Sequence, residues 1–272
     1  MRTVVAAARA DLAGGATALD VVVSAILKLE DSGLVDAGKG SFSNSAGFSE
    51  LDASLMEGHT GRVGAVAAMQ RLKNPIVASR IVMEDTPHVF FAGPAGEKTL
   101  VDLGAELVDD PSSYFIPHRD PGVAGSSRGT VGAVALDRRG NLAAGTSTGG
   151  YPGKLPGRVG DSPIIGASTF ANERYALSAT GRGENFIRRS VTSDIAKRAE
   201  YQGIPLQEAA DFVVGHLLGE IDKIGGAIIA ISRDGDIVMS AVNVFGALHG
   251  YASETTDVQV GVEIRSAAHS KR

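Results

Sequence analysis

Apolar residues recur along the chain at two spacings, that of a helix in some segments and that of a strand in others, and these segments predict helices and hairpins. Residues 2–12 are rich in alanine and end before a glycine pair, which predicts a first helix. Thr17 is placed to cap a second helix, whose apolar residues recur at helical spacing. The same interpretation predicts helices over residues 75–83, 95–103, 183–202 and 206–218, and strands over residues 51–56, 63–69, 88–91, 164–170 and 175–180.

The stretch 126–161 predicts a hairpin with polar residues at its edges. Residues 131–136 form an unbroken apolar run, as expected of a strand covered on both faces. Gly140 supplies the positive-φ position of a tight turn, and residues 142–147 return as the partner strand. The polar residues at the edges of this hairpin are Thr130, Thr148, Arg158 and Asp161.

The order of elements predicts the fold class. Residues 227–232 and 237–241 flank an Arg-Asp-Gly-Asp turn and predict a further hairpin. Helices, paired hairpins and further helices indicate antiparallel sheets covered by helices, an α+β fold that forms a single domain over residues 1–272. Residues 109–127, with three prolines and no periodicity, predict a mobile linker.

Composition narrows the class of protein. Of the 272 residues, 43% are hydrophobic and 21% charged, which is ordinary for a globular chain with a sizeable core. The formal charge is −5 and no basic run occurs, so we expect no nucleic-acid partner. The chain has no cysteine, which excludes thiolate chemistry and suits a reducing compartment. No apolar run approaches the roughly 18 residues of a membrane span, and no signal-peptide cleavage pattern occurs, so we expect a cytoplasmic protein without a membrane partner.

Thr130 has two interpretations. Threonine is β-branched and common in strands, so spacing alone favours a structural role. The alternative is that the Gly129–Thr130 bond is cut, which leaves Thr130 with a hydroxyl and a free α-amine. An α-amine ordinarily has a pKa of about 7.7–8.0, near what a general base needs at neutral pH. A threonine paired with its own amine is an activated nucleophile, and Gly129, without a Cβ, tolerates the strained backbone that such a cut requires.

Several linked motifs then identify a family. They are the strings GTVGAVALD, GNLAAGTSTGG, LPGRVGDSP and TGRGE, preceded by ELDASLMEGHTGRVGAVAAM, NPIVASRIVME and TPHVFF. In this order and spacing they closely resemble the plant-type asparaginase and isoaspartyl peptidase family of N-terminal-nucleophile hydrolases, over most of the chain. The resemblance implies a four-layer αββα sandwich, and cleavage before Thr130 into subunits 1–129 and 130–272. It further implies a dimer of cleaved protomers, no organic cofactor, and hydrolysis of β-aspartyl dipeptides or asparagine.

The resemblance also assigns the residues of the reaction. Thr130 matches the nucleophile, which forms a β-aspartyl ester and releases aspartate. Thr148 matches the threonine that hydrogen-bonds the nucleophile and assists cleavage. Thr180 and Gly181 match the pair that stabilises the oxyanion.

Three further positions match substrate contacts. Arg158 is expected to bind the α-carboxylate with two parallel charged hydrogen bonds, and Asp161 to accept from the α-ammonium. Gly183 matches a backbone contact to the substrate amine. From spacing alone, a surface salt bridge between Arg158 and Asp161 is favoured; the flanking LPGRVGDSP string favours a clamp for a zwitterion.

Residues 30–39 predict a loop that in the family wraps a sodium ion. Hard alkali cations take oxygen ligands, and backbone carbonyls supply them whatever the side chain. A plain helix-to-strand connection is an equal alternative on sequence alone. The resemblance implies as possible sodium ligands Leu29, Glu30, Ser32, Val35, Ala37 and Lys39.

The chain departs from the family pattern at two places. Family members begin with a strand that carries an HGGAG-like loop, whereas this chain begins within the first helix, so we expect that strand to be lost or replaced. The family's Phe-Asn-Ala-Gly is here Val-Asp-Ala-Gly, with Asp36 at the asparagine position near the substrate. An ionised Asp36 cannot donate a hydrogen bond and would weaken oxyanion stabilisation or alter the substrate range. Lys39 is a candidate to neutralise it.

Rival motifs and functions fit the chain less well. Residues 145–149 satisfy the G-x-S-x-G pattern of serine hydrolases, but the Gly/Pro run that follows forbids the required helix. The Gly153-Lys154 pair lacks the flanking residues of a phosphate loop, and the six histidines show no metal-ligand spacing. Isoaspartyl peptidase activity is favoured over efficient asparagine hydrolysis. The open alternatives are an uncleaved, catalytically impaired family member and a glycosylasparaginase-like hydrolase.

Overall fold

Two sheets pack against each other at the centre of the computed structural model, which describes residues 1–116, 129–244 and 247–262. The five-stranded sheet has the order β3-β2-β1-β5-β4 and the four-stranded sheet the order β6-β7-β8-β9. The first sheet contains β1 (Leu51–Glu57), β2 (Val63–Met69), β3 (Phe90–Ala92), β4 (Val131–Leu136) and β5 (Leu142–Thr148). The second contains β6 (Thr169–Ala171), β7 (Tyr175–Gly181), β8 (Gly226–Ser232) and β9 (Ile237–Val242).

Local turn chemistry fixes the central hairpin as predicted. The carboxylate of Asp137 accepts from the backbone N–H groups of Arg139 and Asn141 at 2.9 and 3.0 Å. Gly140 adopts a φ of 81°, which a side chain would disfavour. The turn therefore sets the antiparallel register of β4 and β5, in which Leu136 faces Leu142.

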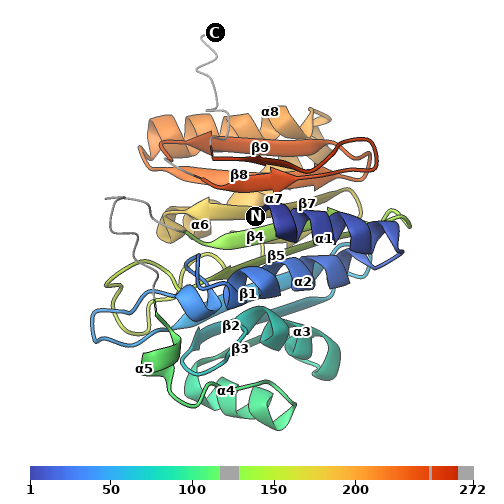
Figure 1. Ribbon diagram of the computed structural model, residues 1–272. Helices are drawn as coiled ribbons and strands as arrows, with labels where there is room; N and C mark the ends of the chain where they lie inside the picture. The colour runs from blue at the N-terminus through green and yellow to red at the C-terminus, as the bar shows by residue number, and fades with distance from the viewer. Residues whose placement is uncertain (117–128, 245–246, 263–272) are drawn as a thin grey trace.

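One layer of helices covers the first sheet (Figure 1). Its main element, α2, begins after Thr17, whose hydroxyl accepts from the N–H of Asp20 at 3.1 Å, as predicted. Val22 and Ile26 of α2 are fully buried against β4 and β5. The helices of this half are α1 (Arg2–Ala13), α2 (Ala18–Asp31), α3 (Pro75–Asp85), α4 (Gly93–Asp102), α5 (Pro111–Tyr114) and a 3-10 turn, Gly38–Gly40.

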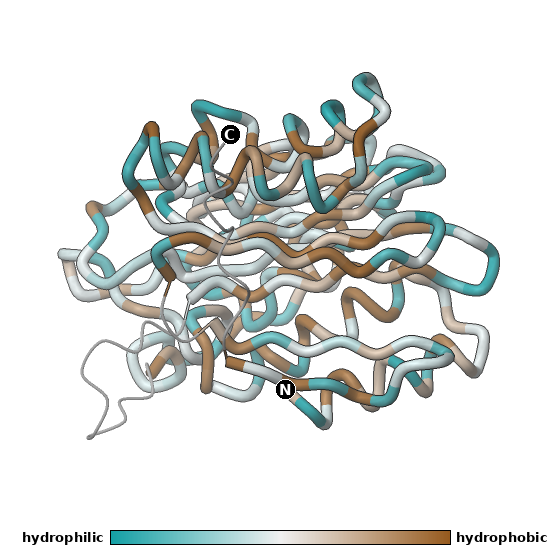
Figure 2. The backbone as a smooth tube through the Cα atoms, turned by 90° about the horizontal axis from the view of Figure 1, so that it is seen from above, coloured by the Kyte–Doolittle hydropathy of each residue, from teal (hydrophilic) through white to brown (hydrophobic). Residues whose placement is uncertain are grey.

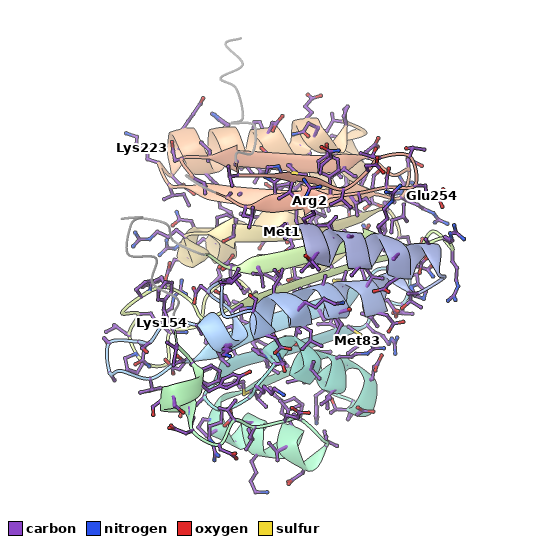
Figure 3. The ribbon with its side chains drawn as sticks, in the orientation of Figure 1. Met1, Arg2, Met83, Lys154, Lys223 and Glu254 are labelled. Carbon is purple, nitrogen blue, oxygen red and sulfur yellow. The ribbon has the colours of Figure 1, made fainter. Side chains whose placement is uncertain are left out.

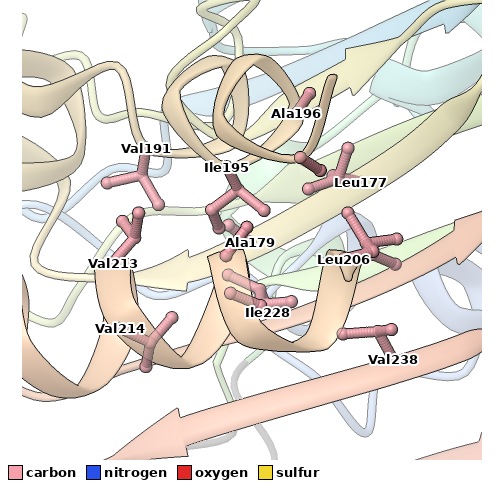
Figure 4. Packing of buried hydrophobic residues seen from close by; sticks show 14 of the residues in the cluster. Leu177, Ala179, Val191, Ile195, Ala196, Leu206, Val213, Val214, Ile228 and Val238 are labelled. Atoms are coloured by element: carbon pink, nitrogen blue, oxygen red, sulfur yellow. The ribbon is translucent and has the colours of Figure 1, made fainter. Parts of the chain in front are cut away.

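A second layer of helices covers the second sheet, so that Figure 2 shows helices on two opposite sides of the strands. It contains α6 (Gly183–Arg189), α7 (Val191–Gln202), α8 (Leu206–Asp211) and a π-helical segment, Phe212–Ile221. Figure 4 shows the core beneath it, where Ile195 and Val213 meet Leu177 and Ile228 of the sheet. The layers are helix, sheet, sheet and helix, which confirms the predicted αββα sandwich.

Three predicted elements are wrong in detail. The single helix expected over residues 183–202 is broken at Ser190, which adopts a left-handed conformation with φ 49° and ψ 50°. The helix expected over residues 206–218 changes to π geometry after Asp211. Of the strand expected over 164–170, only residues 169 and 170 are extended, as the start of β6, because Gly166, at φ 86°, turns the chain.

A hairpin near the end of the described chain was not predicted. Its strands, β10 (His249–Tyr251) and β11 (Gln259–Gly261), have only three residues each, too few for a periodic signal. It packs on α1, where Arg2 donates to the carbonyl of Val258 at 3.2 Å and Arg9 pairs with Asp257 at 2.9 Å.

Beneath α1 lies a cleft of about 1080 Å³, bounded by α2, β4, β8 and β9. The outer edges of β4 and β9 pair with no further strand in the described residues, and no strand precedes α1 there. Of the predicted linker, residues 109–116 include α5, and residues 117–127 lie outside the described ranges. None of the described helices has the length and apolar character needed to cross a membrane.

Candidate active site

The register of β4 and β5 brings two predicted threonines together. Val131 lies opposite Ser147, so Thr130 and Thr148 meet one step further along the ladder. Thr130 Oγ1 donates to Thr148 Oγ1 at 3.0 Å, and the same Thr148 oxygen accepts from the N–H of Gly150 at 3.0 Å. Thr148 is buried and Thr130 half-buried. The hydroxyl of Thr130 is thus held in one orientation while it stays open to the solvent side.

The end of β7 supplies the second predicted pair. A Cβ added to Gly129 would lie 3.7 Å from Thr180 Oγ1, so β7 reaches the 129–130 bond. A Cβ at the next position, Gly181, would lie only 2.4 Å from the ring of the fully buried Phe186. Glycine is therefore required there by packing, and it leaves the backbone beside Thr180 uncovered.

Arg158 and Asp161 converge on Gly183. A Cβ on this glycine would lie 2.7 Å from Arg158 Nη2 and 2.8 Å from Asp161 Oδ1. Asp161 is 6% exposed, and its Oδ2 has no hydrogen-bond partner in the described residues. Burial raises the pKa of Asp161 to about 7. A buried carboxylate oxygen without a donor, beside a guanidinium, suits a ligand that carries both an ammonium and a carboxylate.

Glu184 orients Arg158 and was missed from the sequence, where it resembles a solvated helix residue. Its Oε1 accepts from Arg158 Nε at 3.0 Å, and this bond lowers the pKa of the Glu184 carboxyl. Tyr151 lies on another side, with its ring centre 4.7 Å from Arg158 Cζ. With Nε held and one face covered, the Nη groups remain available for a substrate carboxylate.

The carboxyl of Asp36 is buried and accepts a backbone hydrogen bond. Asp36 is 2% exposed, its Oδ1 accepts from the N–H of Phe42 at 3.0 Å, and its carbonyl accepts from Gly149 at 3.0 Å. Burial raises the pKa of Asp36 to about 7. A pKa in this range makes the protonated carboxyl, which can donate a hydrogen bond, accessible near neutral pH.

The cation beside Asp36 is Lys154 and not Lys39, which corrects the hypothesis about its neutralisation. The charge of Lys154 lowers the pKa of Asp36 against the larger effect of burial. Lys39 instead places its Nζ 5.7 Å from the ring centre of Tyr114. Lys154 is 1% exposed, and Figure 3 shows it among the loops at one end of the first sheet. A lysine in a Gly/Pro loop gives no sequence signal of such burial.

The predicted sodium loop gathers backbone oxygens. A Cβ on Gly40 would lie 2.2 Å from the carbonyl oxygen of Val35, and a Cβ on Gly38 would lie 3.0 Å from that of Glu30. The carbonyls of Leu29, Ala37 and Lys39 each accept a hydrogen bond from a backbone N–H, and a carbonyl oxygen has two lone pairs. Ser32, the remaining predicted position, donates its hydroxyl to the carbonyl of Leu29 at 2.6 Å. The Leu29 carbonyl thus accepts two hydrogen bonds, whereas the carbonyls of Ala37 and Lys39 each keep one lone pair.

The serine-hydrolase alternative is inconsistent with the structure. Ser147 lies inside β5, is fully buried, and donates to Glu30 Oε1 at 2.6 Å. A bend and not a helix follows β5. The motif therefore lacks the exposed turn that presents a nucleophilic serine.

Comparison with known proteins shows which family the chain resembles. The family model described as asparaginase matches residues 1–121 and 113–262. The isoaspartyl peptidase of Escherichia coli (strain K12) is 41% identical over 266 residues, which cover 90% of this chain and 82% of that protein. The probable isoaspartyl peptidase/L-asparaginase 2 of Arabidopsis thaliana is 35% identical, covering 92% of this chain and 87% of that protein. The isoaspartyl peptidase/L-asparaginase of Homo sapiens is 38% identical, covering 82% of this chain and 76% of that protein.

Proposed function

Because this chain belongs to the asparaginase family, we propose that it is an isoaspartyl peptidase that also acts on L-asparagine. It is an amidohydrolase in which Thr130, freed as a chain end, is the nucleophile, and L-aspartate is released from β-aspartyl peptides. The observation that carries this proposal is the 3.0 Å contact between Thr130 Oγ1 and Thr148 Oγ1, beside the convergence of Arg158 and Asp161 on Gly183.

Substrate recognition follows from the three polar groups of an isoaspartyl peptide. Arg158 binds the free α-carboxylate through its Nη groups. The buried Oδ2 of Asp161, which has no partner among the described residues, accepts from the α-ammonium, with the Gly183 backbone beside it. In the proposed complex these two contacts hold the charged end of the substrate, and the side-chain amide carbonyl points to Thr130 Oγ1.

The chemistry needs one base and one oxyanion site. The α-amine of Thr130 takes the proton from Oγ1 as this oxygen attacks the amide carbon. Donors at Thr180 and Gly181 stabilise the oxyanion, an effect of about 3–4 kcal/mol per donor in other hydrolases. The protonated α-amine of Thr130 gives its proton to the leaving amine of the substrate. The C–N bond then breaks, and a β-aspartyl ester remains on Thr130. Water then attacks this ester with the α-amine again as base, which releases aspartate.

Formation of the free α-amine requires self-cleavage between Gly129 and Thr130, giving residues 1–129 and 130–272 as two subunits. The exposed position of Gly129 and the hydrogen bond between the two threonine hydroxyls support this step. In the uncut chain, Thr148 would orient Oγ1 of Thr130 for attack on the Gly129 carbonyl.

The remaining parts of the proposal concern the environment of the enzyme. A sodium ion is proposed at the carbonyls of the 29–39 loop, and sodium should raise the melting temperature over that in choline chloride of equal ionic strength. Two cleaved protomers are proposed to form the active dimer. The cysteine-free composition suits a reducing compartment and supports a cytoplasmic location.

The decisive experiment is mass spectrometry of the purified protein together with an aspartate-release assay on a β-aspartyl dipeptide. We expect two fragments that divide before Thr130, and activity that Thr130→Ala abolishes together with cleavage. Activity of a fully intact chain, unaffected by Thr130→Ala, would contradict the proposal. An intact, inactive wild-type protein would indicate the impaired family member instead.

A further inference from the structure

Buried charged residues lie behind the loop that carries Arg158 and Asp161. We call residues 149–161 the recognition loop. The Oε1 of Glu50 accepts from the N–H of Gly157 at 2.9 Å, and the Oδ2 of Asp52 accepts from the N–H of Gly160 at 3.4 Å. Glu50 directly precedes β1 and Asp52 is its second residue, so this strand end contacts the recognition loop on both sides of Arg158.

Lys154 anchors the loop from the opposite direction. Its Nζ donates to the carbonyl of Glu50 at 2.9 Å, so the loop and β1 exchange hydrogen bonds both ways. The side chain passes beneath Gly150, where an added Cβ would lie 2.7 Å from Lys154 Cδ. Gly150 in turn donates to Thr148 Oγ1, so Lys154 supports both the nucleophile end and the clamp end of the recognition loop.

The burial of these groups makes the arrangement specific. Glu50, Asp52 and Lys154 are 3%, 0% and 1% exposed. An isolated charge at such positions is strongly unfavourable, so each group is held where its partners lie. Truncating one of these side chains leaves the buried charge or hydrogen-bonding group of its partner uncompensated. The recognition loop is then no longer held in place.

We propose that Glu50, Asp52 and Lys154 are positioning residues that hold the recognition loop, and with it Arg158 and Asp161, in register for the α-carboxylate and α-ammonium of the substrate. This inference rests on the proposed function, in which Arg158 and Asp161 bind those two groups. The groups are equally charged in substrate, transition state and released aspartate. We call Glu50, Asp52 and Lys154 the anchor. Loss of the anchor should therefore weaken binding of substrate, transition state and aspartate alike, which raises KM and leaves kcat much less affected.

Glu50→Ala and Lys154→Met test the anchor, and Glu97→Ala is a matched control. Glu97 is also buried, at 7% exposure, and its Oε2 also accepts from backbone N–H groups, those of Gln70, Arg71 and Leu72. None of these partners belongs to the recognition loop, so loss of the Glu97 carboxylate should lower the melting temperature without changing KM. Glu50→Gln keeps an oxygen that can accept from Gly157 but loses the bond that Glu50 Oε2 accepts from Asn44 Nδ2 at 2.8 Å, so it should move KM back toward the wild-type value while lowering the melting temperature.

The measurements are KM for a β-aspartyl dipeptide, the inhibition constant of L-aspartate, and kcat corrected for the cleaved fraction found by mass spectrometry. We expect both anchor variants to raise KM and the inhibition constant by about tenfold or more, with kcat of Glu50→Ala within about threefold of wild type. Lys154→Met should also lower kcat, because it disturbs the Thr148 end of the recognition loop as well. A fall in kcat alone, or the same KM change in Glu97→Ala, would overturn the inference.

Failure of the anchor and failure of the proposed function can be told apart. If the wild-type protein has no activity, calorimetric titration with L-aspartate still compares the affinities of wild type, Glu50→Gln, Glu50→Ala and Glu97→Ala. Unchanged affinity in Glu50→Ala would reject the anchor, whereas loss of affinity there alone would support it. Asp52→Asn, which keeps the shape of the side chain, serves where Glu50→Ala does not fold.

Discussion

Asp161 shows how one buried oxygen sets both the selectivity and the pH response of the site. Its Oδ2 is unpartnered in the described residues, and burial raises the pKa of the carboxyl from its ordinary value of 3.8 to about 7. A neutral acid cannot balance the charge of an ammonium, so ligand binding needs the ionised form. The same shift means that the folded protein binds an extra proton between pH 3.8 and about 7, so stability from this group is lost as pH rises through that interval.

The expected result is that L-aspartate binds more weakly as the pH falls through about 7. The measurement is calorimetric titration of the Thr130→Ala variant, because this variant has no free α-amine at position 130 that would titrate in the same range. Asp161→Asn in that background should bind at least about tenfold more weakly at pH 8 and lose the pH dependence. An affinity that is constant from pH 6 to pH 8 would contradict the role given to Asp161.

For single residues, the sequence predicts the roles of those that belong to linear motifs. It misses residues whose roles depend on contacts with segments distant in the sequence. Thr130 and Thr148 stand at recognisable strand ends, and the hairpin turn between them determines that they meet. Glu184 is 26 residues from Arg158, and its role depends on how α6 is placed against the recognition loop. Lys154 was missed for a related reason, since the burial of a lysine is decided by surrounding segments and not by its own neighbours.

Strands were predicted well where a turn glycine separates a hairpin pair, and the long helix was predicted poorly because its interruption carries no glycine or proline. The strands on either side of Gly140 and Gly235 agree with the prediction, because positive φ at these glycines ends each strand. The break between α6 and α7 occurs at Ser190, a residue type that rarely adopts a left-handed conformation. Apolar spacing continues through this position, so periodicity alone predicted one helix.

Ser190→Gly should therefore stabilise the junction of α6 and α7. Ser190 is exposed and its side chain makes no capping hydrogen bond, so removing it costs little while relieving left-handed strain. We expect the free energy of unfolding to rise by up to about 1 kcal/mol, within the roughly 1–2 kcal/mol that this conformation costs an L-residue. Ser190→Val should lower it by about 1 kcal/mol or more, because a β-branched side chain fits this conformation worst.

Urea denaturation of the two variants beside wild type measures this difference. The ordering valine, serine, glycine in increasing stability is the expected outcome. Equal stability of Ser190→Gly and Ser190→Val would mean that the junction is not strained. Aspartate release should be unchanged in Ser190→Gly, since none of the contacts that form the candidate site involves the side chain of residue 190.

Across the whole molecule, a chain of buried hydroxyls joins the two sheets. Contacts of 2.7, 2.6 and 2.7 Å link Ser178 to Thr146, Thr146 to Thr169, and Thr169 to Ser54, and Ser54 lies 2.6 Å from the carbonyl oxygen of Ser162. Each hydroxyl has one proton, and the carbonyl can only accept. Thr169 donates to Thr146, and Ser54, with one proton to donate, lies within reach of both Thr169 Oγ1 and the Ser162 carbonyl. Either Thr146 or Ser178 can donate in the contact between them. Thr146 therefore has two hydroxyl partners in the chain, whereas Ser178, on β7 of the second sheet, has one.

This arrangement predicts unequal effects for two substitutions that each remove one hydroxyl. Ser178→Ala removes a single contact at the end of the chain, so we expect a loss of about 1 kcal/mol. Thr146→Val removes two contacts and leaves the buried Thr169 O–H without this acceptor, so it should cost about 2–3 kcal/mol. The double variant should lose less than the sum, because the contact between the two hydroxyls is already lost in either single variant. Urea denaturation in the Thr130→Ala background, where we expect an intact chain, measures all three values. Equal single losses that add in the double variant would show that these hydroxyl contacts do not stabilise the packing of the two sheets, and that apolar packing alone holds the sheets together.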